Sequence, residues 1–156
     1  MDRLFLSLSD DPAAVRIGRE APFDPAQFIE RGWSILKHDH RSALLPAFQP
    51  RRVVMLPYHA TSRLVDFLLD QPREGYVPLD LDAFLVLWRR QELIPGCWAM
   101  RRMGMLQRIV FAGTVLRSPA HQPCLLQLCR EPQGWAWTVR SMHNLGGSVY
   151  VPWHPW

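Results

Sequence analysis

The sequence predicts an α+β fold, in which short helices and strands of the N-terminal two-thirds pack on a C-terminal antiparallel β meander. Before about position 105, apolar residues recur at helical spacing behind capping signals. After it, short β-rich runs are separated by Gly, Pro, Ser, His and Asn, as in a meander. With 156 residues, 48% hydrophobic and 21% charged, the chain has the size and composition of one globular domain, which we expect residues 1–156 to form.

Three helices are predicted from capping signals and from spacing. Asp24 as N-cap and Pro25 at the first helical position begin a short helix, which Gly32 is placed to end. A second helix is predicted over 61–69, where leucines and a valine recur at helical spacing. Residues 79–91 predict a third helix, with aspartates at its start and arginines in its last turn, where they suit the helix dipole.

The remaining runs predict strands joined by loops. Residues 1–22 are expected to be partly loop, and the weakly alternating run at 3–8 predicts a short edge strand. Strands are predicted at 33–38 and at 51–56, the second of them closed by Pro57. The predicted C-terminal sheet comprises residues 108–112, 114–117, 124–130, 135–142 and 148–151.

The composition indicates a cytoplasmic protein with no membrane partner. Its apolar runs are far shorter than the ~20 residues that a membrane helix needs, and its first residues lack the apolar core of a secretory signal. The three cysteines, Cys97, Cys124 and Cys129, are an odd number in a chain that shows no export signal. That count favours reduced thiols over disulfides.

Positive charge is concentrated in the C-terminal third of the chain. The net charge is +4 and comes almost wholly from arginine, since Lys37 is the only lysine. From residue 101 onward six arginines stand against one acid, Glu131, a balance of +5, whereas the first 100 residues carry twelve basic and thirteen acidic groups, or −1. A GC-rich genome also produces many arginines, so the asymmetry, more than the total, indicates a polyanionic partner.

Arginine and tryptophan together suggest a nucleic-acid interface. Positive grooves with aromatic platforms hold single strands, at ~1–3 kcal/mol for each stacked base. Trp135 and Trp137 share one face of their predicted strand and Arg140 falls on the other, so the seven tryptophans are more simply explained as core residues. The residues expected to contact phosphates are Arg101, Arg102, Arg108, Arg117 and Arg140.

The segment His38-Asp39-His40 is the best candidate for a metal site. Residues i and i+2 of a strand point to the same face, so both imidazoles could ligate one cation, with His59 as the nearest further ligand. A polar loop between a strand and a helix is the simpler interpretation, because patterns of two ligands are common.

No motif specifies catalysis or a cofactor. The chain has no Gly-x-Ser-x-Gly elbow, no His-Glu-x-x-His and no phosphate-binding loop, and Gly146-Gly147 is a turn. Asp80 and Asp82 are explained by helix capping. We therefore expect no cofactor and assign no catalytic residue.

The last five residues, 152–156, are expected to be extended. Their two prolines exclude a regular helix and a central strand. Trp153 and Trp156 either fold back onto the domain or anchor a protein partner, because tryptophan is enriched at interface hot spots.

Several segments of the chain resemble a family of small bacterial proteins of unknown function, which is common in the genomes of uncultured candidate phyla. They include Phe-x-Pro-x-x-Phe-Ile at 23–29, Gly-Trp-Ser-Ile at 32–35 and Phe-x-Gly-Thr-Val-Leu-Arg-x-Pro at 111–119, within a similarity spanning about residues 22–140. Ala112 stands where an aspartate is usual in the family, and residues 150–156 do not resemble its ending. The resemblance implies a single domain of bacterial origin and brings no activity.

Three functions follow from these observations. The first is a non-catalytic binding module whose basic C-terminal sheet engages nucleic acid or an acidic protein. The second is a protein–protein assembly component that uses exposed tryptophans, and the third is a metal-dependent hydrolase built around His38 and His40.

Overall fold

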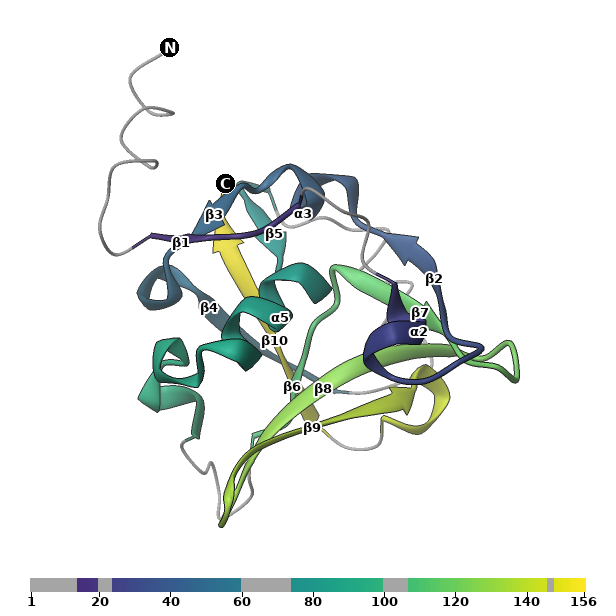
Figure 1. Cartoon of the computed structure of the whole chain (residues 1–156). Helices are drawn as coiled ribbons and strands as arrows, with labels where there is room; N and C mark the ends of the chain where they lie inside the picture. The colour runs from purple at the N-terminus through teal and green to yellow at the C-terminus, as the bar shows by residue number, and fades with distance from the viewer. Residues whose placement is uncertain (1–13, 20–23, 60–73, 100–106, 146–147) are drawn as a thin grey trace.

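Figure 1 shows the computed structural model, which describes residues 14–19, 24–59, 74–99, 107–145 and 148–156. The strand predicted at 3–8, the helix predicted at 61–69 and the turn at 146–147 lie outside these residues. Within the described part, no helix combines the length and the apolar character needed to cross a membrane.

The predicted α+β class is confirmed. The helices are α2 (Pro25–Phe28), α3 (His40–Leu44) and α5 (Leu81–Arg89), with the short 3-10 helices η1 (Pro50–Arg52), η2 (Gln91–Leu93), η3 (Gly96–Ala99) and η4 (Met142–Asn144). The strands are β1 (Val15–Arg16), β2 (Ser34–His38), β3 (Ala47–Phe48), β4 (Val54–His59), β5 (Tyr76–Pro78), β6 (Ile109–Val110), β7 (Thr114–Arg117), β8 (Pro123–Glu131), β9 (Gly134–Ser141) and β10 (Ser148–Pro155).

The predicted N-caps begin helices α2 and α5. The Asp24 carboxylate accepts a hydrogen bond from the Ala26 N–H, and the Asp80 carboxylate accepts one from the Ala83 N–H. Gly32, with φ of +91°, makes the turn between α2 and β2. These signals act over three or four residues, which is why the sequence shows them directly.

One eight-stranded sheet forms most of the structure, in the order β2-β7-β8-β6-β10-β4, with β9 beside β8 and β5 beside β10. A separate sheet joins β1 and β3. Strand β8 pairs with β9 along one edge and shares its other edge between β7 and β6. The sheet is mixed, because β6 and β10 run parallel where Ile109 meets Tyr150.

Alternate residues of the sheet point to two buried faces. Leu116 and Leu126 pack in one apolar cluster with α5, and we call this side the helix-covered face. Val115, Leu125 and Val151 belong to a second cluster, on what we call the opposite face. In Figure 1, α5 and α2 lie on the same side of the sheet.

The C-terminal residues form the middle of the sheet and not a tail. Residues 152–155 belong to β10, which pairs with β4 on one side and with β6 and β5 on the other. The Trp153 side chain is 1% exposed, and His154 is equally buried. The prediction that the prolines exclude this segment from a central strand is therefore wrong.

The prolines of β10 lie where the strand changes or loses a neighbour, and Pro152 falls between the residue that pairs with β6 and those that pair with β5. The Tyr150 N–H donates toward β6 at 2.7 Å, so even-numbered residues of β10 direct their backbone groups toward β6 and β5. Pro152 lies on that side, where its carbonyl accepts from the Leu79 N–H at 3.0 Å. Pro155 faces the side of β4, whose pairing with β10 ends at Trp153.

Strand β4 also differs from its predicted extent, and it continues past a proline. The strand predicted over 51–56 begins later, after η1, and continues through Pro57 to His59, so both predicted ends are wrong. Pro57 lies opposite Tyr150, whose N–H is used on the other side of β10. The missing N–H of Pro57 therefore faces the outer edge of the sheet, where proline is tolerated.

Buried His154 ties β10 to the residue that precedes η1. The Gln49 N–H donates to its Nε2 at 2.9 Å, so the ring proton lies on Nδ1, which donates to the Pro155 carbonyl at 2.7 Å. Burial, assisted by the positive charge of Arg52, lowers the pKa of His154 from its ordinary value of 6.5. The folded protein therefore resists protonation of this ring.

We expect the free energy of unfolding to fall as the pH drops below about 6.5, by at most ~1.4 kcal/mol per pH unit. Below that pH the unfolded chain binds a proton that the folded chain does not bind, until the lowered pKa of the folded state is reached. Urea unfolding at a series of pH values measures the slope. His154→Gln should reduce the slope of the free energy of unfolding against pH, and the control His143→Gln, at an exposed histidine, should leave it unchanged. A full slope in His154→Gln would contradict this assignment.

Candidate functional site

Three cations from three strands lie on the opposite face of the sheet. Lys37 in β2 pairs with Val115, and Arg140 in β9 pairs with Leu125. Residues paired across neighbouring strands point to the same side, and both partners belong to the cluster of the opposite face. Arg117 lies two residues after Val115 in β7 and therefore points the same way. We call Lys37, Arg117 and Arg140 the basic face.

The three charged side chains of the basic face are exposed, although Val115 and Leu125, which lie between Lys37 and Arg140, are buried. All three side chains are exposed, and none of them forms an ion pair with a carboxylate of the residues that the structure describes. Asp39, Asp80 and Asp82 are instead paired with arginines inside the fold. These three carboxylates are therefore used within the fold, while the charge of the basic face remains at the surface.

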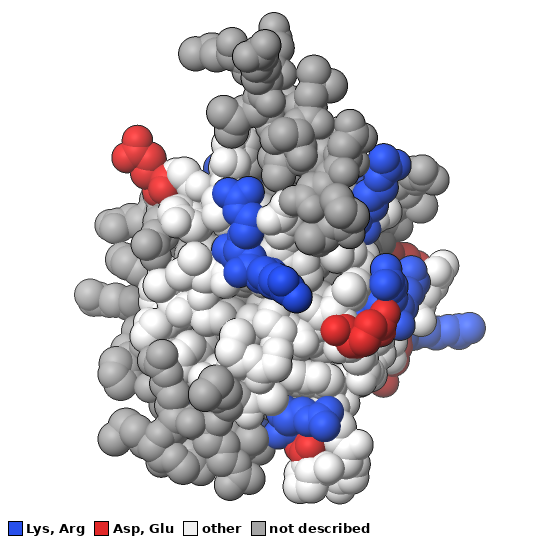
Figure 2. Space-filling model, turned by 90° about the vertical axis from the view of Figure 1, so that its left-hand side faces the viewer, with Lys and Arg blue, Asp and Glu red and all other residues white. Residues whose placement is uncertain are grey.

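The other predicted phosphate contacts do not join this face. Arg101 and Arg102 lie outside the described residues. Arg108 is half-buried and its Nη1 donates to the Leu145 carbonyl at 2.5 Å, so this guanidinium stabilises the fold. Figure 2 shows one side of the molecule, on which the described basic side chains lie in separate groups.

The interpretation of most tryptophans as core residues is confirmed. Trp98 is buried in the cluster of the helix-covered face, and Trp135 and Trp137 pack against it. Arg130 lies over the Trp135 ring at 5.7 Å, on the face away from Arg140. Trp153 is buried, so its prediction as a partner-binding residue is wrong.

Trp156 is the tryptophan that remains at the surface, with 54% of its area exposed. Its backbone N–H donates to the Gly75 carbonyl at 2.9 Å. The indole is therefore presented from an anchored position immediately after β10.

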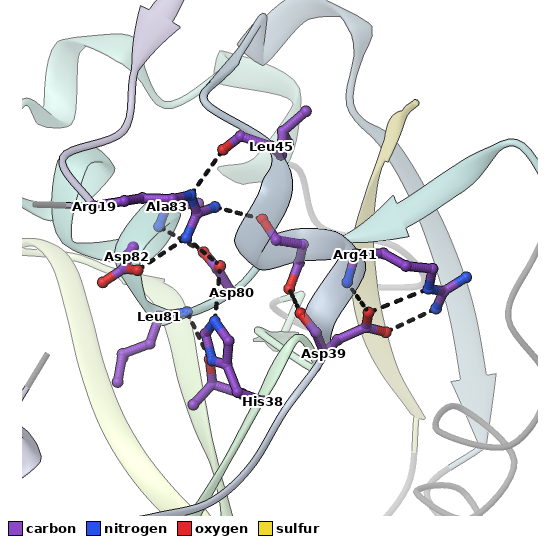
Figure 3. Close-up of polar contacts among 11 residues, drawn as sticks. Arg19, His38, Asp39, Arg41, Leu45, Asp80, Leu81, Asp82 and Ala83 are labelled. Carbon is purple, nitrogen blue, oxygen red and sulfur yellow. Dashed lines mark hydrogen bonds and ion pairs between the residues drawn. The ribbon is translucent and has the colours of Figure 1, made fainter. Parts of the chain in front are cut away.

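A second candidate site is a cluster of charged side chains around the start of α5 (Figure 3). The Nη1 of Arg19 contacts one oxygen of Asp80 at 2.8 Å and one oxygen of Asp82 at 2.9 Å. Its Nε donates to the Leu45 carbonyl at 2.8 Å and its Nη2 to the Ser42 carbonyl at 2.5 Å. The guanidinium thus joins the residues after β1 to both α3 and α5.

His38 enters the cluster from the end of β2. Its Nε2 lies 3.4 Å from Asp80, and its Nδ1 lies 2.9 Å from the hydroxyl of buried Thr114. The Thr114 oxygen also accepts a hydrogen bond from the Leu81 N–H at 3.1 Å. Both ring nitrogens of His38 therefore have partners that fix the orientation of the imidazole.

The predicted pairing of His38 with His40 is wrong. Strand β2 ends at His38, and Asp39 becomes the N-cap of α3, accepting from the Arg41 N–H at 2.9 Å. His40 is then the exposed first residue of that helix, and the alternation of a strand no longer applies to it. The side chain of His59 lies outside the description.

The residues that do meet His38 are Asp80 and Asp82, and one nitrogen or oxygen atom from each lies within 4.8 Å of the others. Sequence reasoning missed this arrangement and missed Arg19, because helix capping already explained the two aspartates. No local signal could have shown it, since Arg19 and Asp80 are 61 residues apart.

The two carboxyl groups differ in their proton affinity. Burial raises the pKa of Asp80, but the hydrogen bonds from His38 and the Ala83 N–H and the charge of Arg19 outweigh it, so its pKa is below the ordinary value. Burial and the neighbouring charge of Asp80 raise the pKa of Asp82. Opposite shifts in an adjacent pair are typical of functional sites and of structural ion-pair networks alike.

Gly113 allows this cluster to assemble. Its N–H donates to the Leu79 carbonyl at 3.0 Å, and its carbonyl accepts from the Asp39 N–H at 2.8 Å. A Cβ atom at this position would lie 2.9 Å from the Cα of Asp80 and from the Leu79 oxygen. A side chain at position 113 would therefore displace Asp80.

Comparisons of the chain with protein-family models, with curated proteins and with solved structures find no match in any of the three. The resemblance to a bacterial family therefore stays a prediction.

Proposed function

We propose that this chain is a non-catalytic module that binds single-stranded nucleic acid through the phosphates. The observation that carries the proposal is the basic face, where the sheet register places Lys37, Arg117 and Arg140 on one side with their side chains exposed. Arginine and lysine at such positions neutralise phosphates without reading base sequence.

The spacing of the basic face suits a flexible strand. Lys37 and Arg140 are at the same level across β2, β7, β8 and β9, and neighbouring strands are ~4.8 Å apart, so their Cα atoms are separated by roughly 14 Å. Arg117 lies between them, two residues further along β7. Three cations over this distance support contacts to a few successive phosphates, in agreement with the positive balance of the C-terminal third.

The triple variant Lys37→Gln, Arg117→Gln, Arg140→Gln should bind a fluorescent single-stranded oligonucleotide more weakly and with a smaller salt dependence. Each phosphate contact on a single strand contributes a slope of about 0.7 to the plot of log affinity against log salt. When the salt concentration rises fourfold, each phosphate contact lowers the affinity by a factor of roughly 2.6. A variant that lacks one contact should therefore lose roughly 2.6-fold less affinity over that range than wild type. Fluorescence anisotropy at several salt concentrations measures both quantities.

The control is Arg89→Gln, because Arg89 is also exposed but ends α5, on the helix-covered face. This control should keep the wild-type salt slope. A triple variant with the affinity and slope of the wild type would remove the proposal. Binding of wild type to polyglutamate but not to the oligonucleotide would indicate an acidic protein partner instead.

Trp156 supports a second candidate function, assembly with a protein partner or with another copy of the chain. A large exposed indole held by a backbone hydrogen bond has the rigidity and the area of an interface anchor. Assembly requires no metal and no phosphate contact, so variants of Trp156 separate it from the first proposal.

A further inference from the structure

The cluster at the start of α5 already holds a cation, because the guanidinium of Arg19 lies between Asp80 and Asp82. Arg19 lies three residues after the end of β1, which pairs with β3. The Arg19 side chain is about one-fifth exposed and that of Asp82 similarly so, at 19% and 18%. The bound cation is therefore reached from solvent on one side and is held by a short segment of the chain.

The set of neighbouring donor atoms is that of a transition-metal site. One imidazole nitrogen and two carboxylate oxygens, from His38, Asp80 and Asp82, lie within 4.8 Å of one another. Open zinc sites use three protein ligands drawn from imidazole nitrogen, carboxylate oxygen and thiolate sulfur, and the imidazole in this set favours zinc over magnesium or calcium.

His38 is oriented as metal-ligating histidines are. Its Nδ1 lies 2.9 Å from the Thr114 hydroxyl, which leaves Nε2 directed at Asp80. A hydroxyl both donates and accepts, so Thr114 is a suitable partner whether Nδ1 carries the proton or not. Nε2 can therefore ligate a metal without rotation of the ring. Metal-ligating histidines usually have their other ring nitrogen held by a hydrogen bond, as Thr114 holds Nδ1 here.

Charge determines that Arg19 and a metal ion exclude each other. Two carboxylates and one guanidinium leave the cluster with a net charge of −1 when His38 is neutral. A divalent ion in place of the guanidinium would bring the charge to zero. Both cations together would repel each other at a distance of a few ångströms in a half-buried site.

We propose that His38, Asp80 and Asp82 form a binding site for a divalent transition metal of the zinc class, and that the metal competes with Arg19. Binding of the ion displaces the Arg19 guanidinium from α5 and from the Leu45 and Ser42 carbonyls, while β1 remains paired with β3. The site is separate from the basic face and does not depend on nucleic-acid binding.

The test is a titration of Zn²⁺ into the full chain by calorimetry, with wild type, Arg19→Gln and the double variant Arg19→Gln, His38→Gln. Arg19→Gln should bind one Zn²⁺ about tenfold or more tightly than wild type, and the double variant should lose that site. The control Arg19→Gln, His143→Gln removes an exposed histidine instead and should keep it. Circular dichroism checks that each variant is folded.

A folded Arg19→Gln that binds Zn²⁺ no more tightly than wild type overturns the proposal, as does tight binding that persists in the double variant. Wild type provides a second measurement that needs no Arg19 variant. Saturating Zn²⁺ should increase tryptic cleavage after Arg19 severalfold, and His38→Gln should abolish the increase. Equal cleavage of wild type with and without bound Zn²⁺ would overturn the displacement.

Discussion

Trp153→Ala is expected to lower the free energy of unfolding by about 3–5 kcal/mol, the usual loss when a buried tryptophan is truncated to alanine. Trp153 is fully buried at the centre of the sheet, where it packs in the cluster of the opposite face and pairs with both β4 and β5. A loss of that size is a large part of the roughly 5–15 kcal/mol that holds a domain folded. Urea unfolding followed by circular dichroism measures it.

Two matched variants make this test specific. Trp156→Ala removes an exposed indole three residues later and should change stability by less than about 0.5 kcal/mol. Trp153→Phe should cost much less than alanine, because it keeps most of the ring and removes an indole N–H that finds no acceptor among the described residues. Equal losses in Trp153→Ala and Trp156→Ala would show that β10 does not occupy the centre of the sheet.

Trp156→Ala also tests the assembly function, because its effect on stability should be small. If the exposed indole joins two copies, light scattering should give a lower mass for the variant than for wild type. The same mass for both proteins counts against self-assembly through Trp156.

Asp80→Ala is expected to cost a similar amount, about 3–5 kcal/mol, which is the usual penalty for breaking a buried ion pair from one side. The change leaves the half-buried guanidinium of Arg19 with Asp82 alone. It also removes the N-cap of α5 and the partner of His38 Nε2. Urea unfolding at neutral pH measures this loss.

Asp80→Asn separates the charge of the carboxylate from its capping role, since the amide oxygen can still accept from the Ala83 N–H. Asp80→Asn should lower the free energy of unfolding by less than Asp80→Ala does. It should also change how steeply that free energy falls as the solution becomes acidic. The pKa of Asp80 is lowered in the folded state, so its contribution to stability is present above the ordinary value of 3.8 and is lost as the pH falls through the lowered pKa. The free energy of unfolding of Asp80→Asn should therefore fall less steeply with decreasing pH than that of wild type. The same acid slope in both proteins would contradict the ion pair.

The parts of the fold that could be predicted are those specified by neighbouring residues. Asp24 and Asp80 cap their helices within three residues, and β8 and β9 are consecutive strands joined by a short turn. The position of β10 could not be predicted in the same way. Whether a strand tolerates proline depends on which side its missing N–H faces, and that side is set by β6, β5 and β4 from earlier in the chain.

The candidate sites show the same limit. Arg117 and Arg140 were predicted from charge alone, but the register that joins Lys37 to them is a property of four paired strands. His38 was predicted with the wrong partner, because Asp39 ends the strand by capping a helix, a role that an aspartate between two histidines does not announce. Arg19 carried no signal at all, since its carboxylate partners are more than 60 residues away.

The central position of β10 has a consequence for how the protein is made. Every other described strand precedes β10 in the chain, yet β4, β5 and β6 all pair with it. During synthesis these three strands emerge before β10. The backbone edges that later pair with β10 remain unpaired until residues 148–155 are available. Unpaired edges attract other chains, and closure through distant contacts is slow. The edges of β4, β5 and β6 are therefore exposed to aggregation in any state of the chain in which β10 has not yet docked.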